Sequence, residues 1–497
     1  MLSPMPAPLV RLLAIVVALA AGTALFAETR QYGLIGFDTY PLIVSSRVEA
    51  PSDLMGLLVE QLMDGRYPSP FYRPVTSASF ALDEALWGLD AFGYQLTGAL
   101  LFTGLLLLAA ALGWRVGGSG ARWLAIAIPA ALALDPAHYE IVPVPARRAD
   151  LLCCLFVTAA AVAALGGRRW AAGAASLLAI LSKESGYVAP ILVLSAGWWF
   201  ATELSGRARL RHTARLAAPS VVFAVGALGG RFWLLGGVGG HPGGFGPAAV
   251  AALGPDLLLE VARGSALFHA AQTPLAWWVL FASLACATIA SAGADPDEVG
   301  DAGLRRALGF GLTWWVAFAA LYVISGWVGA WYFLLPGVGV AIVVSSGVGK
   351  LVSTFRAPQT APLQRAAAFA AALGLCAVVL WQASFAPFFH AYGEWQRATG
   401  VAQAFLTELD RRIEAAGEGT VIDAPPLPMW AFPREGVPGV AGAAILSDYS
   451  VQAWAELVHP DRQIRVLGAR GGILPRQPAR AGADELVIRL PRRRAGY

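Results

Sequence analysis

Two adjacent charges interrupt an otherwise apolar stretch of the chain. In LLAILSKESGYVAPILVL, residues 177–194, Lys183 is followed directly by Glu184, and the nearest charges on either side are Arg169 and Glu203. Charged side chains within apolar segments are costly, and most of them have a function or a partner. The pair is therefore a chance loop, an ion pair that satisfies itself, or part of a site.

Other polar residues that could take part in chemistry also gather between apolar segments. A carboxylate can take a proton from an acceptor hydroxyl, and arginine or lysine can hold a phosphate leaving group and stabilise its developing charge. Together these residue types provide what group transfer from a phosphate-linked donor requires. The candidates are Asp38 in LIGFDTYP, Arg73 in FYRPVTSASF, and His138, Glu140, Arg147, Arg148 and Asp150 in DPAHYEIVPVPARRADLL.

Each candidate taken alone also has a structural interpretation. Asp38 suits the cap of a short loop helix, His138 an ordinary hydrogen-bonded loop position, and Asp83 a solvated helix face. Arg147 and Arg148 suit the end of a membrane helix, where long basic side chains reach the lipid headgroups. The functional interpretation depends on all the candidates lying on the same side of a membrane.

The apolar composition predicts the elements that must position these residues. Of the 497 residues, 57% are hydrophobic and only 14% are charged, whereas a soluble domain carries roughly 25% charged residues. This composition excludes a water-soluble protein and predicts an all-α polytopic membrane protein. Eleven apolar segments are predicted as membrane helices, near residues 8–27, 95–113, 122–134, 150–165, 170–182, 187–202, 217–235, 274–292, 307–324, 332–349 and 366–386.

The placement of basic residues predicts the orientation in the membrane. With the N-terminus in the cytoplasm, every predicted inner loop is basic, as the positive-inside rule requires. The outer side then contains the first loop, residues 28–94, the segment 236–273, the chain from 387 onward and all the candidate residues. Residues 1–27 are interpreted as a retained first helix, with a cleaved signal peptide as the alternative. The inner-loop residues are Arg115, Arg122, Arg168, Arg169, Arg207, Arg209, Arg211, Arg215, Arg305, Arg306, Lys350, Arg356 and Arg365.

The end of the chain is much less apolar than the rest. Residues 387–497 are predicted as a small extracytoplasmic α/β domain, and residues 1–386 as the membrane domain. A helical pattern covers residues 394–416, and TVIDA and ELVIRL have the pattern of strands. The closing RLPRRR is interpreted as a solvated tail. The four cysteines lie in apolar runs without metal-ligand spacing, and no nucleic-acid motif is present.

Four stretches carry a family pattern, in the order YRPVTSASFALDEALWGLDAFGYQLTGALL, HYEIVPVPARRADLLCCLF, LAILSKESGYVAP and WYFLLPGVGVAI. They resemble motifs of the GT-C superfamily of polytopic glycosyltransferases, which use polyprenyl-phosphate sugars as donors. The nearest likeness is to the protein O-mannosyltransferase-like branch, which often carries tetratricopeptide repeats. The motif spacing selects Arg148 rather than Arg147. In the last stretch Trp331 stands where the family has arginine, and the tail shows no tetratricopeptide pattern.

The resemblance implies roles for the candidate residues. Asp38 occupies the place of the catalytic base in the first outer loop. Glu140 and His138 are second choices for acid–base or sugar-orienting work. The residues implied to bind the donor phosphate are Arg73, Arg148 and Lys183, with Glu184 holding Lys183 in place. Relatives often have a second acidic residue near the first, whereas Thr39 and Tyr40 follow Asp38 here, so the need for a divalent metal stays open and no metal ligand is assigned.

These observations predict an inverting, mannosyltransferase-like glycosyltransferase in a membrane. It would move a sugar from a polyprenyl-phosphate donor to a hydroxyl of a protein or an envelope glycan. Its other predicted partner is membrane lipid, and no nucleic-acid partner is predicted. The abundant Ala, Gly, Arg and Trp favour a bacterial inner membrane, with the site facing the periplasm. Two alternatives remain: a transporter or flippase for a lipid-linked substrate, which would show two related halves with broken helices, and a catalytically inactive scaffold of the same fold.

Overall fold

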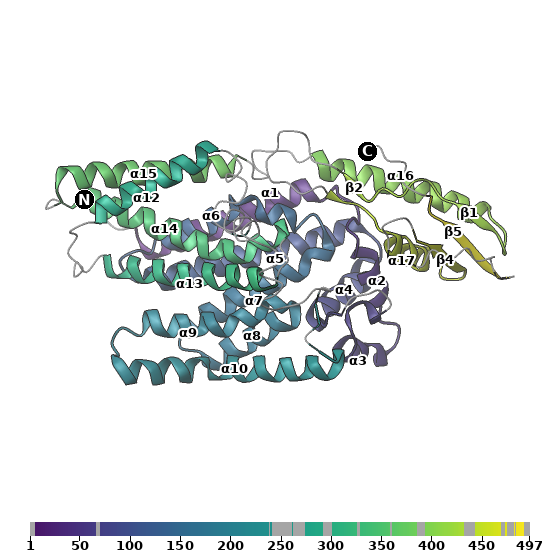
Figure 1. Cartoon of the computed structure of the whole chain (residues 1–497), viewed down its shortest axis with the longest axis horizontal. Helices are drawn as coiled ribbons and strands as arrows, with labels where there is room; N and C mark the ends of the chain where they lie inside the picture. The colour runs from purple at the N-terminus through teal and green to yellow at the C-terminus, as the bar shows by residue number, and fades with distance from the viewer. Residues whose placement is uncertain are drawn as a thin grey trace.

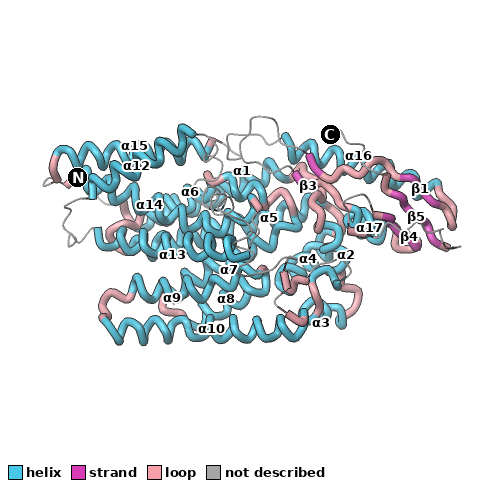
Figure 2. Tube along the Cα trace, in the orientation of Figure 1, coloured by secondary structure: helices cyan, strands magenta, loops and turns pink. Residues whose placement is uncertain are grey.

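Helices form most of this computed structural model, and strands occur only at one end (Figure 2). The structure describes residues 5–65, 70–237, 239–240, 261, 274–291, 301–325, 329–357, 360–384, 393–431, 443–468, 473–474, 482 and 484–491.

A helix coincides with each of the eleven predicted apolar segments. Seven helical segments are long and apolar enough to cross a membrane, which makes the chain an integral membrane protein. The eleven helices run mainly along the long axis of the molecule (Figure 1). They are α1 (Ala7–Thr29), α5 (Ala91–Gly117), α6 (Leu124–Ala133), α7 (Arg148–Leu165), α8 (Arg169–Ser182), α9 (Ala189–Phe200), α10 (Gly206–Leu235), α12 (Pro274–Ser291), α13 (Asp301–Ser325), α14 (Leu334–Arg356) and α15 (Pro362–Ala383).

The predicted boundaries fail at α10. This helix begins at Gly206, so Arg207 and Arg215, predicted in an inner loop, lie in its first turns. Arginine lowers the hydropathy of a segment but is a good helix former, so a boundary set by hydropathy falls inside the helix. The predicted outer segment 236–273 lies almost entirely outside the described residues.

Close approach of two helices depends on paired glycines. A Cβ added to Gly311 of α13 would lie 3.0 Å from the carbonyl oxygen of Gly339, and one added to Gly339 of α14 would lie 2.8 Å from the oxygen of Gly311. Small residues at such positions allow membrane helices to pack backbone against backbone. This contact fixes α14, whose N-terminal end follows the short helix η6 (Ala330–Phe333), against α13.

Short elements collect at one end of the membrane helices (Figure 1). The first loop forms α2 (Thr39–Ser45), α3 (Pro51–Val59), η1 (Leu62–Gly65) and α4 (Pro74–Trp87). The other connections form η2 (Pro136–Glu140), η3 (Pro145–Arg147) and η4 (Glu184–Val188). Proline in the first turn helps to start α3 and α4, because its fixed φ suits a helix and its missing N–H would be unpaired there anyway.

The end of the chain folds as an α/β unit, as predicted. It contains α16 (Gly393–Ala415), α17 (Asp448–Val458) and a parallel sheet in the order β1 (Val421–Asp423), β5 (Glu485–Arg489), β4 (Gln463–Leu467). The register pairs Val421 with Val487 and Ile464 with Leu486. Two shorter strands, β2 (Trp430–Ala431) and β3 (Ala443–Ala444), pair antiparallel. The predicted boundary at residue 387 falls outside the described residues, so the division into two domains stays a prediction.

Candidate active site

The turn between α8 and α9 points the two adjacent charges toward different partners. Lys183 has an extended backbone, with φ −161° and ψ 151°, and successive side chains on extended backbone point to opposite sides. Lys183 Nζ lies 2.5 Å from Asp150 Oδ1, whereas Glu184 pairs with Arg73 and Arg231. The predicted arrangement, in which Glu184 holds Lys183, is therefore corrected: each charge has its partner elsewhere.

Tight backbone packing holds this turn in place. A Cβ added to Gly186 would lie 2.4 Å from the carbonyl carbon of Ala179, so η4 packs directly on the end of α8 and only glycine fits. Thr76 Oγ1 of α4 donates a hydrogen bond to the carbonyl oxygen of Ser182 at 2.9 Å. The end of α8 is thus fixed by η4 on one side and by the first loop on the other, which fixes the direction of Lys183.

Lys183 is buried between a carboxylate and an aromatic ring. Its side chain is 6% exposed and that of Asp150 is 3% exposed. The Lys183 Nζ atom also lies 4.1 Å from the centroid of the Tyr332 ring, close enough for a cation–π interaction. Burial lowers the pKa of Lys183, and the neighbouring Asp150 opposes this effect. Asp150 on α7 and Tyr332 on η6 therefore position the ammonium group between three helices.

Glu184 joins two arginines from distant parts of the chain. Arg73, immediately before α4, donates from Nη2 to Glu184 Oε2 at 2.7 Å and from Nε at 3.1 Å. Arg231, near the end of α10, donates from Nη1 to Oε1 at 2.9 Å. Burial raises the pKa of Glu184, but the two guanidinium groups outweigh it and lower the pKa to about 2. Glu184 is therefore ionised at neutral pH and organises two cations.

Arg147 lies against two indole rings and a carboxylate. Its Nη1 atom donates to the carbonyl oxygen of Glu140 at 2.5 Å and to Oε2 of the same residue at 3.2 Å. Its guanidinium carbon lies 4.1 Å from the ring centroid of Trp331 and 5.9 Å from that of Trp395 on α16. Burial raises the pKa of Glu140 to about 7, although Arg147 opposes the shift. Glu140 can therefore take up or release a proton near neutral pH.

Arg148 pairs with a carboxylate of α4. Its Nη2 atom lies 2.5 Å from Asp83 Oδ2, and its guanidinium covers the ring of Phe80 on α4 at 4.8 Å. Asp83, predicted on a solvated face, is only 1% exposed. The Arg148–Asp83 pair fastens the start of α7 to α4, and the role of Arg148 in phosphate binding stays a prediction.

The predicted base Asp38 immediately precedes α2. Its side chain makes no capping hydrogen bond to α2, so the interpretation as a helix cap does not hold. Its Oδ1 atom instead accepts a hydrogen bond of 2.6 Å from the hydroxyl of Tyr449 on α17. Asp38 is within electrostatic reach of Arg147. A partly exposed carboxylate thus acts on a buried cation through space.

His138 is packed as a neutral ring. It is 1% exposed and stacks on Phe102 of α5, with ring centroids 4.6 Å apart and an interplanar angle of 23°. Burial lowers its pKa to about 4, so the imidazole is uncharged at neutral pH. Its predicted role in acid–base or sugar-orienting work stays a prediction.

These residues form one group, here called the charge cluster. Asp150 is within electrostatic reach of Lys183, Arg73 and Arg147, which links the contacts described above. The members come from α7 and α10, from η2, η3 and η4, and from the residues that immediately precede α2 and α4 or follow α8. The charge cluster consists of the cations Arg73, Arg147, Lys183 and Arg231 and the carboxylates Asp38, Glu140, Asp150 and Glu184.

An apolar groove lies between α9 and α13. It has a volume of about 690 Å³ and is lined by Ile191, Trp199, Val316 and Ile324 among others. Tyr187 of η4 also lines it, and this residue follows Glu184 by three positions. The groove therefore reaches η4, the short helix that begins at Glu184.

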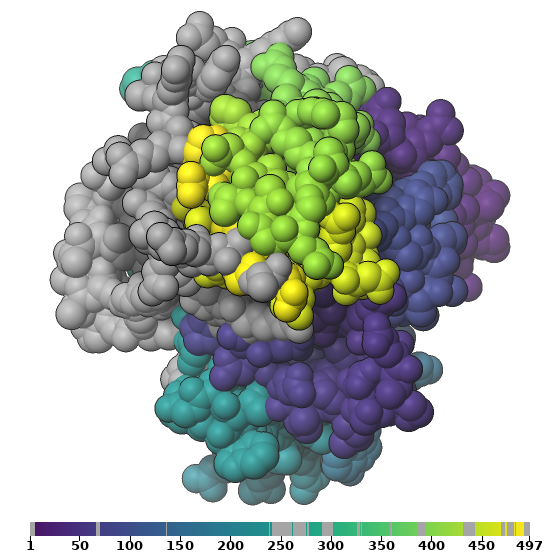
Figure 3. All heavy atoms as spheres, turned by 90° about the vertical axis from the view of Figure 1, so that its right-hand side faces the viewer, coloured from purple at the N-terminus to yellow at the C-terminus, as the bar shows by residue number. Residues whose placement is uncertain are grey.

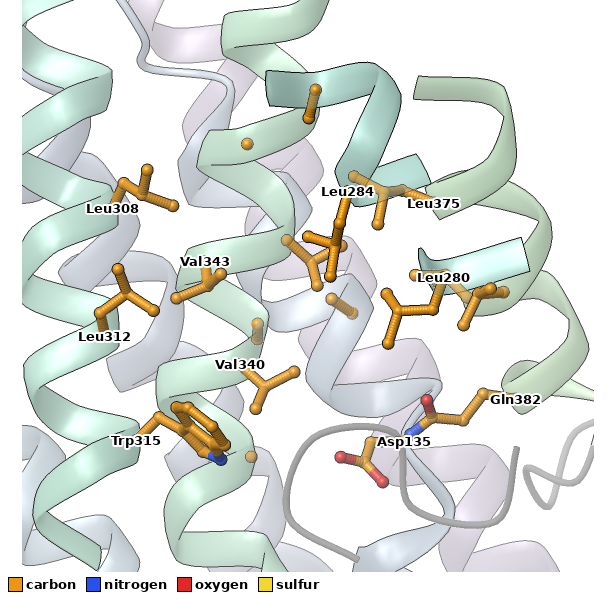
Figure 4. Close-up of a pocket in the computed structure, with 18 of the residues that line it drawn as sticks. Asp135, Leu280, Leu284, Leu308, Leu312, Trp315, Val340, Val343, Leu375 and Gln382 are labelled. Atoms are coloured by element: carbon orange, nitrogen blue, oxygen red, sulfur yellow. The ribbon is translucent and has the colours of Figure 1, made fainter. Parts of the chain in front are cut away.

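A second cavity, of about 420 Å³, lies between α6, α12, α13, α14 and α15. Figure 4 shows its labelled leucines, valines and Trp315, with Asp135 and Gln382 together at one end. Burial raises the pKa of Asp135 to about 6. No member of the charge cluster lines this cavity or the groove between α9 and α13, but the groove includes Tyr187 of η4, the short helix that begins at Glu184.

Three carboxylates of the charge cluster face cations. Glu140, Asp150 and Glu184 are each paired with a lysine or arginine. Within the described ranges, no three His, Cys, Asp or Glu side chains come together as a metal site would require, and the need for a divalent metal stays open.

Known proteins give a structural likeness only. No family model and no curated protein matches the chain. Two solved chains of ArnT from Cupriavidus metallidurans are similar to it, one bound to undecaprenyl phosphate and one in the apo state. The first is 15% identical with a TM-score of 0.40, and the second is 16% identical with a TM-score of 0.41. Each match covers 79% of this chain and 80% of that chain. We draw no functional argument from a likeness at this level, and the function is argued from this chain's own residues.

Four contributors were missed or undervalued in the sequence. Arg231 is a single charge in the apolar stretch GGRFWLL, a signal that points to a site in membrane helices. Trp331 and Tyr332 belong to the last of the four motifs, and each lies against a cation of the charge cluster. Tyr449 had no local signal, because its partner Asp38 is 411 residues away in the sequence.

Proposed function

We propose that this protein is an integral-membrane glycosyltransferase of the GT-C type, which moves a sugar from a polyprenyl-phosphate donor to an acceptor hydroxyl. The observation that carries the proposal is the group of four cations around carboxylates, together with an apolar groove that reaches η4, the helix that begins at Glu184. A lipid phosphate is an anion on an apolar chain, and this arrangement provides for both parts.

Donor binding would use the groove and three of the cations. The prenyl chain would lie between α9 and α13, with its phosphate near Lys183. Both side-chain hydrogen bonds of Arg147 within the described structure come from Nη1, which leaves Nη2 and Nε for phosphate oxygens. Arg73 uses Nε and Nη2 for Glu184 and keeps Nη1. Guanidinium groups suit phosphate because their donors form a planar fork.

The transfer step follows from the position of Asp38. The acceptor oxygen attacks the anomeric carbon of the sugar while Asp38 takes the hydroxyl proton. The bond between that carbon and the donor phosphate oxygen breaks, and polyprenyl phosphate leaves with the electron pair. Arg73, Arg147 and Lys183 stabilise the charge that develops on the leaving phosphate. A single displacement of this kind inverts the anomeric configuration.

Glu140 would balance the charge of the bound donor. Its pKa of about 7 places proton uptake within reach when a phosphate arrives beside Arg147. The rest of the proposal follows the sequence: a mannose-type sugar, a protein or envelope-glycan acceptor, and a bacterial inner membrane with the site on the periplasmic face, as the basic inner loops indicate.

The test is release of polyprenyl phosphate from polyprenyl-phosphate mannose by the purified protein, supplied with cell-envelope extract. The Asp38→Asn variant should release it at least about 100-fold more slowly, because general-base catalysis contributes roughly 10²–10⁴-fold. Asp53→Asn is the matched control. Asp53 is an exposed carboxylate of the same loop that accepts backbone hydrogen bonds at the start of α3, and asparagine can make the same cap.

Two results would count against the proposal. Equal release by the wild type and Asp38→Asn would remove Asp38 as the base. Movement of the donor across sealed vesicles without any sugar transfer would favour a transporter.

A further inference from the structure

The C-terminal unit is seated directly on the loop that carries Asp38. Across this contact the Tyr449 hydroxyl donates to Asp38 Oδ1 at 2.6 Å and the Ser450 hydroxyl donates to the carbonyl oxygen of Phe37 at 2.5 Å. The backbone N–H of Gly36 donates to the carbonyl oxygen of Ile445 at 2.9 Å. Figure 3 shows the C-terminal residues, light green to yellow, lying directly above the purple first-loop residues.

Apolar packing continues across the same contact. The ring of Phe37 meets that of Trp430 edge to face, with centroids 4.8 Å apart. The N–H of Gly33 donates to Thr399 Oγ1 of α16 at 3.1 Å. Leu34 and Ile35 of the loop belong to one continuous buried core with residues of α16 and α17. The loop is therefore held by the C-terminal unit on several sides, and not by one side chain alone.

The backbone that carries Tyr449 is itself fixed by buried hydrogen bonds. Ser447 caps α17 by accepting from the N–H of Ser450, and the Ser450 hydroxyl accepts from the N–H of Ser447 in return. The carboxylate of Asp448, fully buried, accepts backbone N–H bonds from Tyr449, Ile473 and Leu474. The backbone position of Tyr449 is therefore fixed, and its hydroxyl reaches Asp38 from a defined direction.

A hydroxyl that donates to a carboxylate has two effects on a general base. It stabilises the ionised form, which is the form that can accept a proton. It also restrains rotation of the carboxylate, so that the acceptor hydroxyl meets an oxygen of defined position. Burial, and next the charge of Asp38, raise the pKa of Tyr449 well above its usual value, so the tyrosine remains a donor throughout the working pH range.

We propose that Tyr449 is a positioning residue for Asp38, so that the C-terminal unit completes the active site of the membrane domain. This inference rests on the proposed function only in naming Asp38 as the base. The hydrogen bond and its effect on the Asp38 carboxylate exist whatever the donor is.

The experiment compares full-length wild type, Tyr449→Phe and Thr399→Val by two readouts as a function of pH. The first is the rate of polyprenyl phosphate release from polyprenyl-phosphate mannose with envelope extract. The second is labelling of Asp38 by a water-soluble carbodiimide, which reacts with the protonated carboxyl, quantified by mass spectrometry. Loss of a hydrogen bond to a charged group should move the acidic limb of the rate profile and the labelling midpoint upward by about one pH unit.

Thr399→Val is the matched control at the same contact. It removes a hydroxyl that accepts from the backbone N–H of Gly33 and leaves Tyr449, the cap of α17 and Asp38 in place. Both of its pH midpoints should stay at the wild-type value, and thermal unfolding of all three proteins should verify that the variants fold. If Thr399→Val shifts both midpoints as far as Tyr449→Phe does, docking alone accounts for the effect and the inference is overturned.

The outcomes separate the two proposals. Unchanged midpoints in Tyr449→Phe overturn the role of Tyr449, whether or not the wild type transfers sugar. If the labelling midpoint shifts in Tyr449→Phe but the wild type releases no polyprenyl phosphate, the effect of Tyr449 on the Asp38 carboxylate is supported. The same result counts against the proposed function.

Discussion

Replacing Lys183 tests whether this residue is a phosphate ligand or only a member of a structural ion pair. Lys183 and Asp150 are 6% and 3% exposed and 2.5 Å apart, so Lys183→Met leaves a carboxylate buried without its main partner. Breaking a buried pair in this way costs about 3–5 kcal/mol of folding free energy. Replacing both members, as in Lys183→Met with Asp150→Leu, removes the unpaired charge, and such apolar replacement is often close to neutral. The double variant should therefore unfold near the wild-type temperature.

The activity of the double variant decides the role of the lysine. If Lys183 stabilises the leaving phosphate, the stable double variant should still lose about 10²–10³-fold in turnover, the usual effect of removing one donor from a developing anion. The assay is the release of polyprenyl phosphate at saturating donor, with thermal unfolding measured in parallel. A double variant that is both stable and fully active would refute the reasoning and reduce Lys183 to an ion-pair partner.

The Arg148–Asp83 pair offers a matched control for that experiment. It is equally buried, with side chains 2% and 1% exposed, and equally short at 2.5 Å. Arg148→Met alone should be destabilised by a similar amount, and Arg148→Met with Asp83→Leu should regain stability. Because this pair faces α4 and not the charge cluster, the double variant should keep its turnover. A loss of turnover there would restore Arg148 as a phosphate ligand.

Two further predictions concern the supports of the site. Gly186→Ala would place a Cβ 2.4 Å from the backbone of Ala179. We expect thermal unfolding to show a loss of about 1–3 kcal/mol of stability, because the site is then overpacked. The control is Gly229→Ala on α10, where a Cβ would have no atom within 4 Å, and its stability should be unchanged or higher. Since burial lowers the pKa of His138 to about 4 from its usual 6.5, its neutral form stabilises the fold above pH 6.5, and this stability is lost as the pH falls toward 4. His138→Phe can still stack on Phe102, and this variant should lose less stability than the wild type as the pH falls from 6.5 to 4. If the unfolding free energies of both proteins fall in parallel with pH, His138 does not titrate in this way.

Hydropathy predicted the positions of the apolar helices well, and seven helical segments within the described residues are long and apolar enough to cross a membrane. Each of the eleven apolar segments is a helix. Their ends were predicted less well, since a helix continues wherever its backbone hydrogen bonds can continue. The start of α10 at Gly206 shows this, because its first turns are basic and still helical.

The site was predicted at the level of which residues gather, not of which residues pair. Asp38, Arg73, Lys183 and Glu184 all lie in the charge cluster, as expected from their predicted outer position. Adjacency in sequence suggested that Lys183 pairs with Glu184, but extended backbone sends neighbouring side chains apart. Partners such as Arg231 come from a helix whose proximity to the turn is set by tertiary packing.

Two neighbouring arginines illustrate the same limit more sharply. Motif spacing selected Arg148, whereas the structure turns Arg147 toward Glu140 and Trp331 and turns Arg148 toward Asp83. The break between η3 and α7 falls between the two residues. If α7 began one residue earlier or later, the side chains of Arg147 and Arg148 would exchange directions. No pattern in a single sequence fixes where this helix begins.

The contact between Tyr449 and Asp38 has a consequence for the order in which the protein is made. A ribosome releases Asp38 early and Tyr449 after another 411 residues, so every membrane helix has been synthesised before this hydrogen bond can form. During insertion the nascent chain contains Asp38 and the cations of the charge cluster, but the hydrogen bond from Tyr449 to Asp38 has not yet formed. A chain that is truncated before α17 should therefore insert into the membrane and still lack the hydrogen bond that Tyr449 gives to Asp38.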